Sequence, residues 1–139
     1  MRLIKYLIIF IIIFLCTFSA YSECILIISK EGSLSKINSL ELKRLFSGKT
    51  KTLSGVKVSF VLQKKNNQIH NEFLKTYLKK STQQFSKTWK KLIFTGKAKS
   101  PKSLNSDKDV VEFLKQNKNF IGYIDSENFT DAVKKIEVH

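Results

Sequence analysis

The segment whose residue types could bind a ligand is Gln63-Lys64-Lys65-Asn66-Asn67-Gln68. It follows an alternating apolar pattern and precedes a helical one, so it lies where a strand ends and a helix begins. Backbone N–H groups at a helix start have no partner within the helix, and the helix dipole favours an anion there. We predict an oxyanion-binding turn formed by Lys64, Lys65, Asn66, Asn67 and Gln68. The alternative is a solvated turn with Asn67 as its helix N-cap.

Few other residues in the chain suggest chemistry. The two histidines, His70 and His139, are far apart in the sequence, and no carboxylate pair stands beside either of them at helical spacing. We therefore expect no metal and no cofactor. The sequence also lacks the G-x-S-x-G, H-E-x-x-H and P-loop patterns of serine hydrolases, zinc hydrolases and nucleotide-binding proteins. No set of catalytic residues is present, so we expect a protein that is not an enzyme.

Four further residues have a structural and a functional interpretation. Asp107 and Asp109 fit the first turn of a helix, where the dipole favours negative charge. Trp89 and Tyr123 fit core positions, or alternatively the wall of a ligand cleft.

The first 22 residues predict an export signal. Arg2 and Lys5 precede the apolar stretch Tyr6–Phe18, and Ala20-Tyr21-Ser22 offers small residues at a cleavage site. We expect a signal peptide over residues 1–22 and one mature domain over residues 23–139. An uncleaved N-terminal anchor is the alternative, and in that case the leader alone would contact the membrane.

Cysteine content limits covalent bridging. Cys16 would leave with the leader, so Cys24 would be the only thiol of the mature chain and no intrachain disulfide could form. Cys24 fits a small apolar residue at the start of a strand, or alternatively an intermolecular bridge or a reactive thiol.

The charge is strongly positive. Removal of Arg2 and Lys5 lowers the formal net charge from +14 to +12. Such a field attracts anions, although a lysine excess that reflects AT-rich codon usage would give the same composition. Arg44 is the only arginine after residue 22. Because nucleic-acid recognition usually recruits arginine and exposed aromatic side chains, we expect no nucleic-acid partner.

The apolar patterns predict alternating strands and helices. We expect strands at 24–28, 56–62 and 120–124, helices at 39–46, 67–78, 82–95 and from 106 or 107 onward, a loop at 97–105, and a final strand or short helix around 133–138. Capping patterns at Asn38 and Ser81 mark two of the helix starts. This alternation predicts an α/β domain with a sheet covered on both sides.

An ordered set of motifs resembles a known family. It consists of Phe46-Ser47-Gly48-Lys49, Gly55-Val56-Lys57-Val58, Trp89 before Phe94-Thr95-Gly96-Lys97, and Phe120-Ile121-Gly122-Tyr123. The chain resembles short, exported relatives of the phosphate-binding proteins of ABC uptake systems. The resemblance implies a single lobe of a type II periplasmic-binding-protein-like fold, a central mixed sheet flanked by helices, and a periplasmic location. It also implies an arginine with small residues at the oxyanion turn, where this chain has residues 63–68 without arginine, serine, glycine or threonine.

Two functions remain open from the sequence. The first is an exported solute-binding protein that binds a small oxyanion such as phosphate in connection with ABC-type uptake, with a permease or a second copy as partner. The second is an adaptor that has kept the lobe, has lost its ligand, and docks on an envelope protein or an anionic surface.

Overall fold

The computed structural model describes the backbone of residues 1–15 and 22–139, and the side chains of residues 1–11 and 22–139. Cys16, together with Ala20 and Tyr21 of the expected cleavage motif, lies outside the described residues. Helix α1 spans Arg2–Leu15. Within the described ranges, no helix combines the length and the apolar character needed to cross a membrane.

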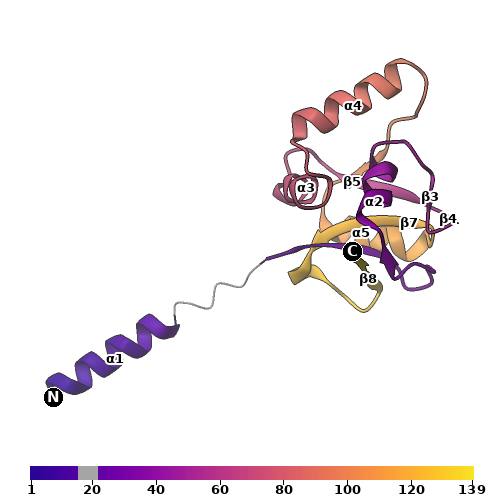
Figure 1. The fold of residues 1–139 in the computed structure, drawn as a ribbon. Helices are drawn as coiled ribbons and strands as arrows, with labels where there is room; N and C mark the ends of the chain where they lie inside the picture. Colours follow the sequence, from indigo (N-terminus) through magenta and orange to yellow (C-terminus); the bar gives the residue numbers. More distant parts are fainter. Residues whose placement is uncertain (16–21) are drawn as a thin grey trace.

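We call residues 23–139 the body. A mixed sheet forms its centre (Figure 1), with the strands in the order β2-β8-β1-β7-β5-β6. Central β1 pairs antiparallel with both β7 and β8, whereas β5 pairs parallel with β7 and β6. The strands are β1 (Cys24–Ser29), β2 (Lys36–Ile37), β5 (Ser59–Gln63), β6 (Lys102–Leu104), β7 (Phe120–Asp125) and β8 (Val133–Val138). A separate hairpin pairs β3 (Thr52–Leu53) with β4 (Val56–Lys57).

Helices cover both faces of this sheet. One face carries α2, α3 with its continuation η1, and α4, while α5 covers the other face. The helices are α2 (Ser39–Phe46), α3 (Gln68–Phe73), the π-helix η1 (Leu74–Leu78), α4 (Thr82–Phe94), α5 (Asp107–Gln116) and the 3-10 turn η2 (Ser126–Asn128). The α/β class, and a central mixed sheet between helices, are therefore confirmed.

Strand β1 is apolar from Cys24 to Ile28 because helices cover both faces of the sheet. Side chains alternate between the two faces of a strand. Leu26 and Ile28 enter the cluster beneath α2 and α3, whereas Ile25 and Ile27 enter the cluster beneath α5. All six residues of β1 are buried, because the strand has a hydrophobic cluster on each side.

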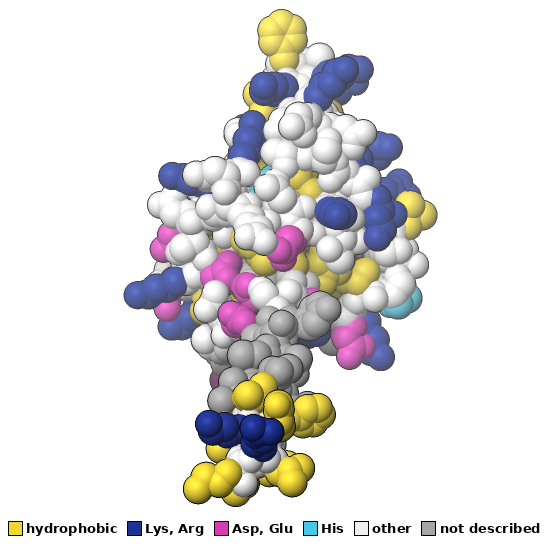
Figure 2. Space-filling view, turned by 90° about the vertical axis from the view of Figure 1, so that its left-hand side faces the viewer, with side chains coloured by type: hydrophobic (Ala, Val, Ile, Leu, Met, Phe, Trp, Pro, Cys, Tyr) yellow, Lys and Arg dark blue, Asp and Glu magenta, His cyan; other side chains and the backbone are white. Residues whose placement is uncertain are grey.

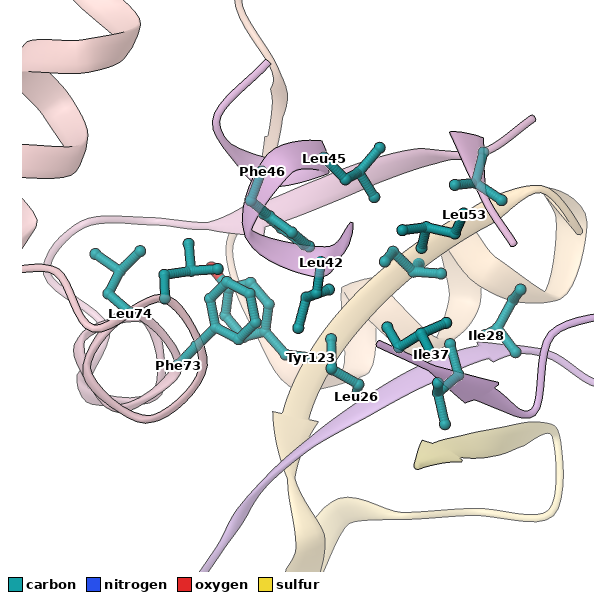
Figure 3. Close-up of a cluster of buried hydrophobic side chains, with 14 of the residues drawn as sticks. Leu26, Ile28, Ile37, Leu42, Leu45, Phe46, Leu53, Phe73, Leu74 and Tyr123 are labelled. Carbon is teal, nitrogen blue, oxygen red and sulfur yellow. The ribbon is translucent and has the colours of Figure 1, made fainter. Parts of the chain in front are cut away.

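The larger cluster is rich in aromatic residues (Figure 3). Phe73 of α3 stacks on Tyr123 of β7, with ring centroids 4.0 Å apart, and Phe46 of α2 lies 4.8 Å from Phe73. Trp89 of α4 is buried, and its indole N–H donates to the carbonyl of Phe46 at 2.9 Å. These contacts join three helices to the sheet.

The smaller cluster requires a close approach of α5 to β7. A Cβ atom at Gly122 would lie 2.7 Å from Val110 Cγ1 of α5 and 3.2 Å from Val61 Cγ2 of β5. Glycine at the centre of the Ile121-Gly122-Tyr123 motif therefore lets the helix lie directly on the strand.

The structure corrects three of the expected elements. The single strand expected at 56–62 is two strands: β4 belongs to the hairpin, and β5 enters the main sheet. The expected loop at 97–105 contains edge strand β6, and its exposed, polar residues gave no strand pattern. The expected helix at 67–78 changes to π geometry at Leu74 and ends at Lys79, whose φ is 54°.

The body holds its own core. Every described buried hydrophobic side chain lies between Cys24 and Ile136, whereas the described side chains of α1 are exposed. Residues 23–139 therefore contain the packing that their fold requires.

Candidate functional site

The predicted turn joins β5 to α3 at one edge of the sheet. The N–H of Lys64 donates to the carbonyl of Leu104 at 3.1 Å and so extends the β5–β6 pairing. The N–H of Asn67 donates back to the carbonyl of Lys64 at 3.0 Å. Lys64, Lys65 and Asn66 are exposed between these two bonds.

The first turn of α3 presents open donors. Among the residues that the structure describes, no protein acceptor takes the N–H of Gln68 or of Ile69. Asn67 is the N-cap residue, as expected, and has extended backbone, but its side chain makes no capping hydrogen bond. The amide of Asn67 instead donates to Gln63 Oε1 at 3.0 Å and to the carbonyl of Asn105 at 2.9 Å. These two bonds tie the turn to its neighbours and leave the helix start uncapped.

A buried network of polar side chains connects the start of the turn at Gln63 to the sheet and to α5. Gln63 is only 2% exposed. Its backbone N–H donates to the Tyr123 hydroxyl at 2.8 Å, and its side-chain amide donates to Asp107 Oδ1 at 2.6 Å. The Tyr123 hydroxyl lies 2.6 Å from His70 Nδ1. The hydroxyl accepts from Gln63, and no other acceptor for its proton occurs among the described hydrogen bonds. We therefore assign it as the donor to His70 Nδ1, with the imidazole proton on Nε2.

Burial sets the protonation states in this network. It lowers the pKa of His70 from 6.5 to about 4, and the nearby positive charge of Lys65 contributes in the same direction. Burial also raises the pKa of the Tyr123 phenol. Both side chains are therefore neutral at neutral pH, and the network is a support rather than an acid–base pair.

The turn forms one wall of an open surface hollow. Of the five predicted site residues, Asn66, Asn67 and Gln68 line it, whereas Lys64 and Lys65 do not. Lys65 lies instead on a lysine-containing surface beside α4, with Lys87 and Lys90.

The other lining residues come from two connections that sequence reasoning missed. Asn105, Ser106 and Asp107 precede and open α5, and residues 127–130 follow β7. Ser106 Oγ accepts the N–H of Asp109 at 3.2 Å and caps α5, so the hydroxyl proton remains available to a ligand. A helix start at residue 106 or 107 was expected from the sequence, but its position beside the turn follows only from the β5–β6 pairing.

Asp107 is the main correction at the level of single residues. It opens α5 as predicted, but its carboxylate also joins three elements. Oδ1 accepts from Gln63, and Oδ2 accepts the N–H of Asp125 at 3.0 Å and the amide of Asn128 at 2.8 Å. Asp107 is therefore a structural link across the hollow, a role beyond its interaction with the helix dipole.

The hollow carries charges of both signs. Its acidic side chains are Asp107, Glu112, Asp125 and Glu127, and its basic ones are Lys108 and Lys115. Acidic side chains also gather on the face shown in Figure 2. A ligand in this hollow would meet backbone N–H donors and carboxylates together, and this combination suits an anion that can itself donate a proton.

The remaining candidates occupy structural positions. Trp89 and Tyr123 belong to the core, with exposed fractions of 8% and 0%. Cys24 is buried in β1, and burial together with neighbouring carboxylates, Glu72 first, raises the pKa of its thiol. His139 is exposed at the last position of the chain. Within residues 1–15 and 22–139 no three His, Cys, Asp or Glu side chains are arranged to hold a metal ion.

Comparison with known proteins gives a likeness of fold. No protein-family model matches the chain, and no curated protein sequence matches it. A phosphate ABC transporter substrate-binding protein with bound phosphate from Clostridium perfringens superposes with a TM-score of 0.67 at 14% identity, over 84% of this chain and 45% of that one. PstS from Borrelia burgdorferi gives 0.62 at 14% identity, over 85% and 47%. An ABC-type phosphate transport receptor from Vibrio cholerae gives 0.57 at 11% identity, over 84% and 46%.

These structures establish the fold that the motifs suggested. The chain has the fold of one lobe of such binding proteins and spans slightly less than half of their length.

Proposed function

We propose that this chain is an exported, periplasmic solute-binding protein whose lobe binds a small oxyanion, with phosphate the first candidate, in connection with ABC-type uptake. Residues 1–22 would act as the signal peptide and residues 23–139 as the binding lobe. The ligand would lie in the hollow beside residues 64–68.

The fold likeness is the observation that carries this proposal. The solved structures that share the fold are named as phosphate-binding or phosphate-transport proteins, and one of them holds phosphate. Their names describe transport components, which agrees with the lack of a catalytic constellation in the sequence. They do not favour the alternative of an adaptor that has lost its ligand.

The hollow supplies donors for an oxyanion. The N–H groups of Gln68 and Ile69 have no acceptor among the described residues, and the Ser106 hydroxyl, which also lines the hollow, can donate. Lys64 and Lys65 add a positive field from the adjacent surface. Asp107 and Asp125 would repel a fully ionised ligand. Hydrogen phosphate can donate its proton to a carboxylate, whereas sulfate carries no proton at neutral pH, so we expect a preference for phosphate.

A single lobe leaves the ligand partly exposed. Sites for small molecules normally bury most of the ligand surface, and an open hollow cannot do so alone. We therefore expect a permease subunit or a second copy of the chain to cover the site, and weaker binding by the isolated lobe than by the covered one.

Calorimetric titration of residues 23–139 with phosphate and with sulfate tests the proposal. We expect heat of binding with phosphate and a much smaller signal with sulfate. Titration without heat at millimolar phosphate would contradict ligand binding by this lobe, and equal binding of the two anions would contradict the role of the carboxylates.

Gln68→Pro locates the site. Gln68 is the first residue of α3, where proline is tolerated, and Asn67 already has the extended backbone that a following proline requires, with φ −75° and ψ 130°. The variant removes one open N–H while the helix is kept. Gln68→Ala loses the same side chain but keeps the N–H. We expect a roughly tenfold loss of phosphate affinity in Gln68→Pro alone, the order of one hydrogen bond to a charged group. Equal affinities in the two variants would place the ligand elsewhere.

A further inference from the structure

The positive charge of the protein is concentrated in one segment. Between Glu72 and Asp107 the sequence contains nine lysines and no acidic residue. All eleven acidic residues therefore lie outside this segment, where they offset most of the other basic residues. Such a separation produces a local positive field, not an evenly basic surface.

Helix α4 carries this charge away from the sheet. Phe85 and Trp89 are buried and attach the first half of α4 to the body. Leu92 also packs against the larger cluster, and the last residues of α4 extend beyond these contacts (Figure 1). We call Lys87, Lys90, Lys91, Ile93 and Phe94 the α4 tip. Its three lysines are exposed, Ile93 is 41% exposed and Phe94 is 94% exposed.

The exposure of Phe94 stands out against a matched position in the same chain. The F-x-G-K motif occurs twice, at residues 46–49 and 94–97, and each copy ends a helix with a glycine of positive φ. Phe46, the last residue of α2, is fully buried, whereas Phe94 lies in solvent beside Ile93, Lys90 and Lys91. Figure 2 shows hydrophobic and basic side chains together at this end of the molecule, while the acidic side chains lie farther down the same face.

We propose that the α4 tip docks on the surface of an anionic phospholipid bilayer. Phe94 and Ile93 would enter the boundary between head groups and acyl chains, and the lysines would face lipid phosphates. Aromatic and aliphatic side chains with flanking lysines are the composition that binds this boundary. The surface is separate from the ligand hollow, so this contact does not depend on the proposed ligand, and it adds a second membrane contact beyond the leader.

Charge and shape favour a bilayer over other partners. Lysine is depleted from protein–protein interfaces, whereas mobile lipid head groups accept several flexible ammonium groups at once. A nucleic-acid surface would be expected to use arginine for base contacts, and no arginine occurs in residues 73–106.

Vesicle sedimentation of residues 23–139 tests this proposal. Removal of the leader is necessary because apolar α1 would bind vesicles by itself, and the core lies entirely within the part retained. We expect binding to vesicles of phosphatidylcholine with phosphatidylglycerol, little binding to phosphatidylcholine alone, and a steep loss with added salt. Equal binding to both kinds of vesicle would contradict the proposal.

Two variants locate the contact. Each lysine near an anionic surface contributes about a fivefold gain in affinity, so Lys87→Gln, Lys90→Gln and Lys91→Gln combined should weaken binding about 100-fold. The matched control is Lys30→Gln, Lys57→Gln and Lys118→Gln combined, which removes the same charge from exposed positions outside the segment. If the control variant weakens vesicle binding as much, the binding arises from the net charge of the whole protein and not from the α4 tip, and the proposal fails.

Phe94→Trp reports insertion directly. Trp89 is buried, so the unmodified chain should show no emission change with anionic vesicles, whereas Phe94→Trp should shift to shorter wavelength. Phe94→Ser should bind about tenfold more weakly, and Leu40→Ser, at another exposed apolar position, should not. A shift with a single-stranded oligonucleotide but not with vesicles would overturn the proposal in favour of nucleic acid.

The same samples separate this inference from the proposed function. The triple lysine variant at the α4 tip should bind phosphate as the unmodified chain does, because none of its three residues lines the hollow. Loss of vesicle binding with phosphate binding retained, or the reverse, therefore identifies which proposal has failed.

Discussion

Two aspartates in the first turn of α5 look equivalent in the sequence but have different surroundings. Asp107 accepts hydrogen bonds from Gln63, Asp125 and Asn128, whereas Asp109 is exposed and none of the described hydrogen bonds involves its carboxylate. From the sequence, the only role that could be predicted for either aspartate was a favourable interaction with the helix dipole. The difference arises because β7 and the end of β5 lie beside the first residue of α5 in the fold.

Asp107→Ala should therefore destabilise the protein far more than Asp109→Ala. Loss of three bonds to a carboxylate that is partly shielded from solvent should lower the free energy of unfolding by about 2–3 kcal/mol, against about 0.5 kcal/mol for the dipole interaction of Asp109. Urea denaturation of the two variants measures both. Similar losses in the two would show that the carboxylate of Asp107 does not link the three elements.

His70 should make stability depend on pH. Its pKa is about 4 in the folded protein, lowered by burial and then by Lys65, and 6.5 is its ordinary value. Above pH 6.5 both states are neutral and the full stability is present. As the pH falls from 6.5 towards 4, the unfolded chain takes up a proton that the folded protein does not, so stability falls by about 2–3 kcal/mol.

His70→Gln checks this window because glutamine can still accept from Tyr123 and does not titrate. The variant should lose most of the slope between pH 6.5 and 4 in urea denaturation. Exposed His139→Gln is the control and should keep the slope. A slope unchanged by His70→Gln would assign the acid sensitivity to other groups.

At the scale of elements, two helices end in the same motif but in different surroundings. Gly48 after α2 and Gly96 after α4 have φ values of 72° and 71°. A Cβ atom at Gly48 would lie 2.9 Å from Leu92 Cδ1 and 3.4 Å from Trp89 Cη2, whereas nothing lies within 4 Å of one at Gly96. The lack of a side chain at Gly48 therefore permits α4 to pack against the end of α2. At Gly96, glycine is required only by the left-handed backbone that ends α4.

Gly48→Ala should cost more than Gly96→Ala. The left-handed backbone alone costs about 1 kcal/mol in either variant, and the contact with Leu92 adds about 1–2 kcal/mol at Gly48. Thermal or urea unfolding of both variants gives the difference. Equal losses would indicate that α4 does not pack against the end of α2 as described.

Element prediction was successful where the pattern was strong. The runs at 24–28 and 120–124, the helices capped at Asn38 and Ser81, and the helix start at residue 106 or 107 are confirmed, with Ser106 as the cap of the last one. Strand β6 was missed because Lys102–Leu104 is exposed and polar, and its strand geometry comes from pairing with β5. An exposed edge strand is defined by its backbone pairing with a neighbouring strand, not by an apolar pattern of its own. The neighbour of β6 is distant in the sequence, so the pairing could not be predicted.

At the scale of the whole molecule, residues 1–11 and the body are separable in terms of packing. The described hydrophobic core runs from Cys24 to Ile136, and residues 1–11 contribute no buried side chain to it. The division at residue 22 was expected from the charge and apolar pattern of residues 1–22, and the signal peptide and its cleavage both stay predictions.

Deletion of residues 1–22 should leave the stability of the body nearly unchanged. Among the described contacts, the deletion removes the exposed hydrogen bond of Ser22 to Asp125, so the free energy of unfolding should change by less than about 0.5 kcal/mol. Urea denaturation of residues 23–139, and of the full chain in mild detergent, measures this. A large loss, or a body without a cooperative transition, would show that the leader belongs to the folded unit.

The sequence by itself determined the α/β alternation, most helix boundaries, the position of the candidate turn and the concentration of lysines. These properties depend on residues close together in the chain, where periodicity and capping act. Only the tertiary structure decided that residues 66–68 and Ser106 line the same hollow, that Asp107 joins three elements, and that Phe46 is buried while Phe94 is exposed. Those outcomes depend on which distant segments pack together. The phenylalanine of the F-x-G-K motif is buried in one copy and exposed in the other because different segments lie beside the two copies.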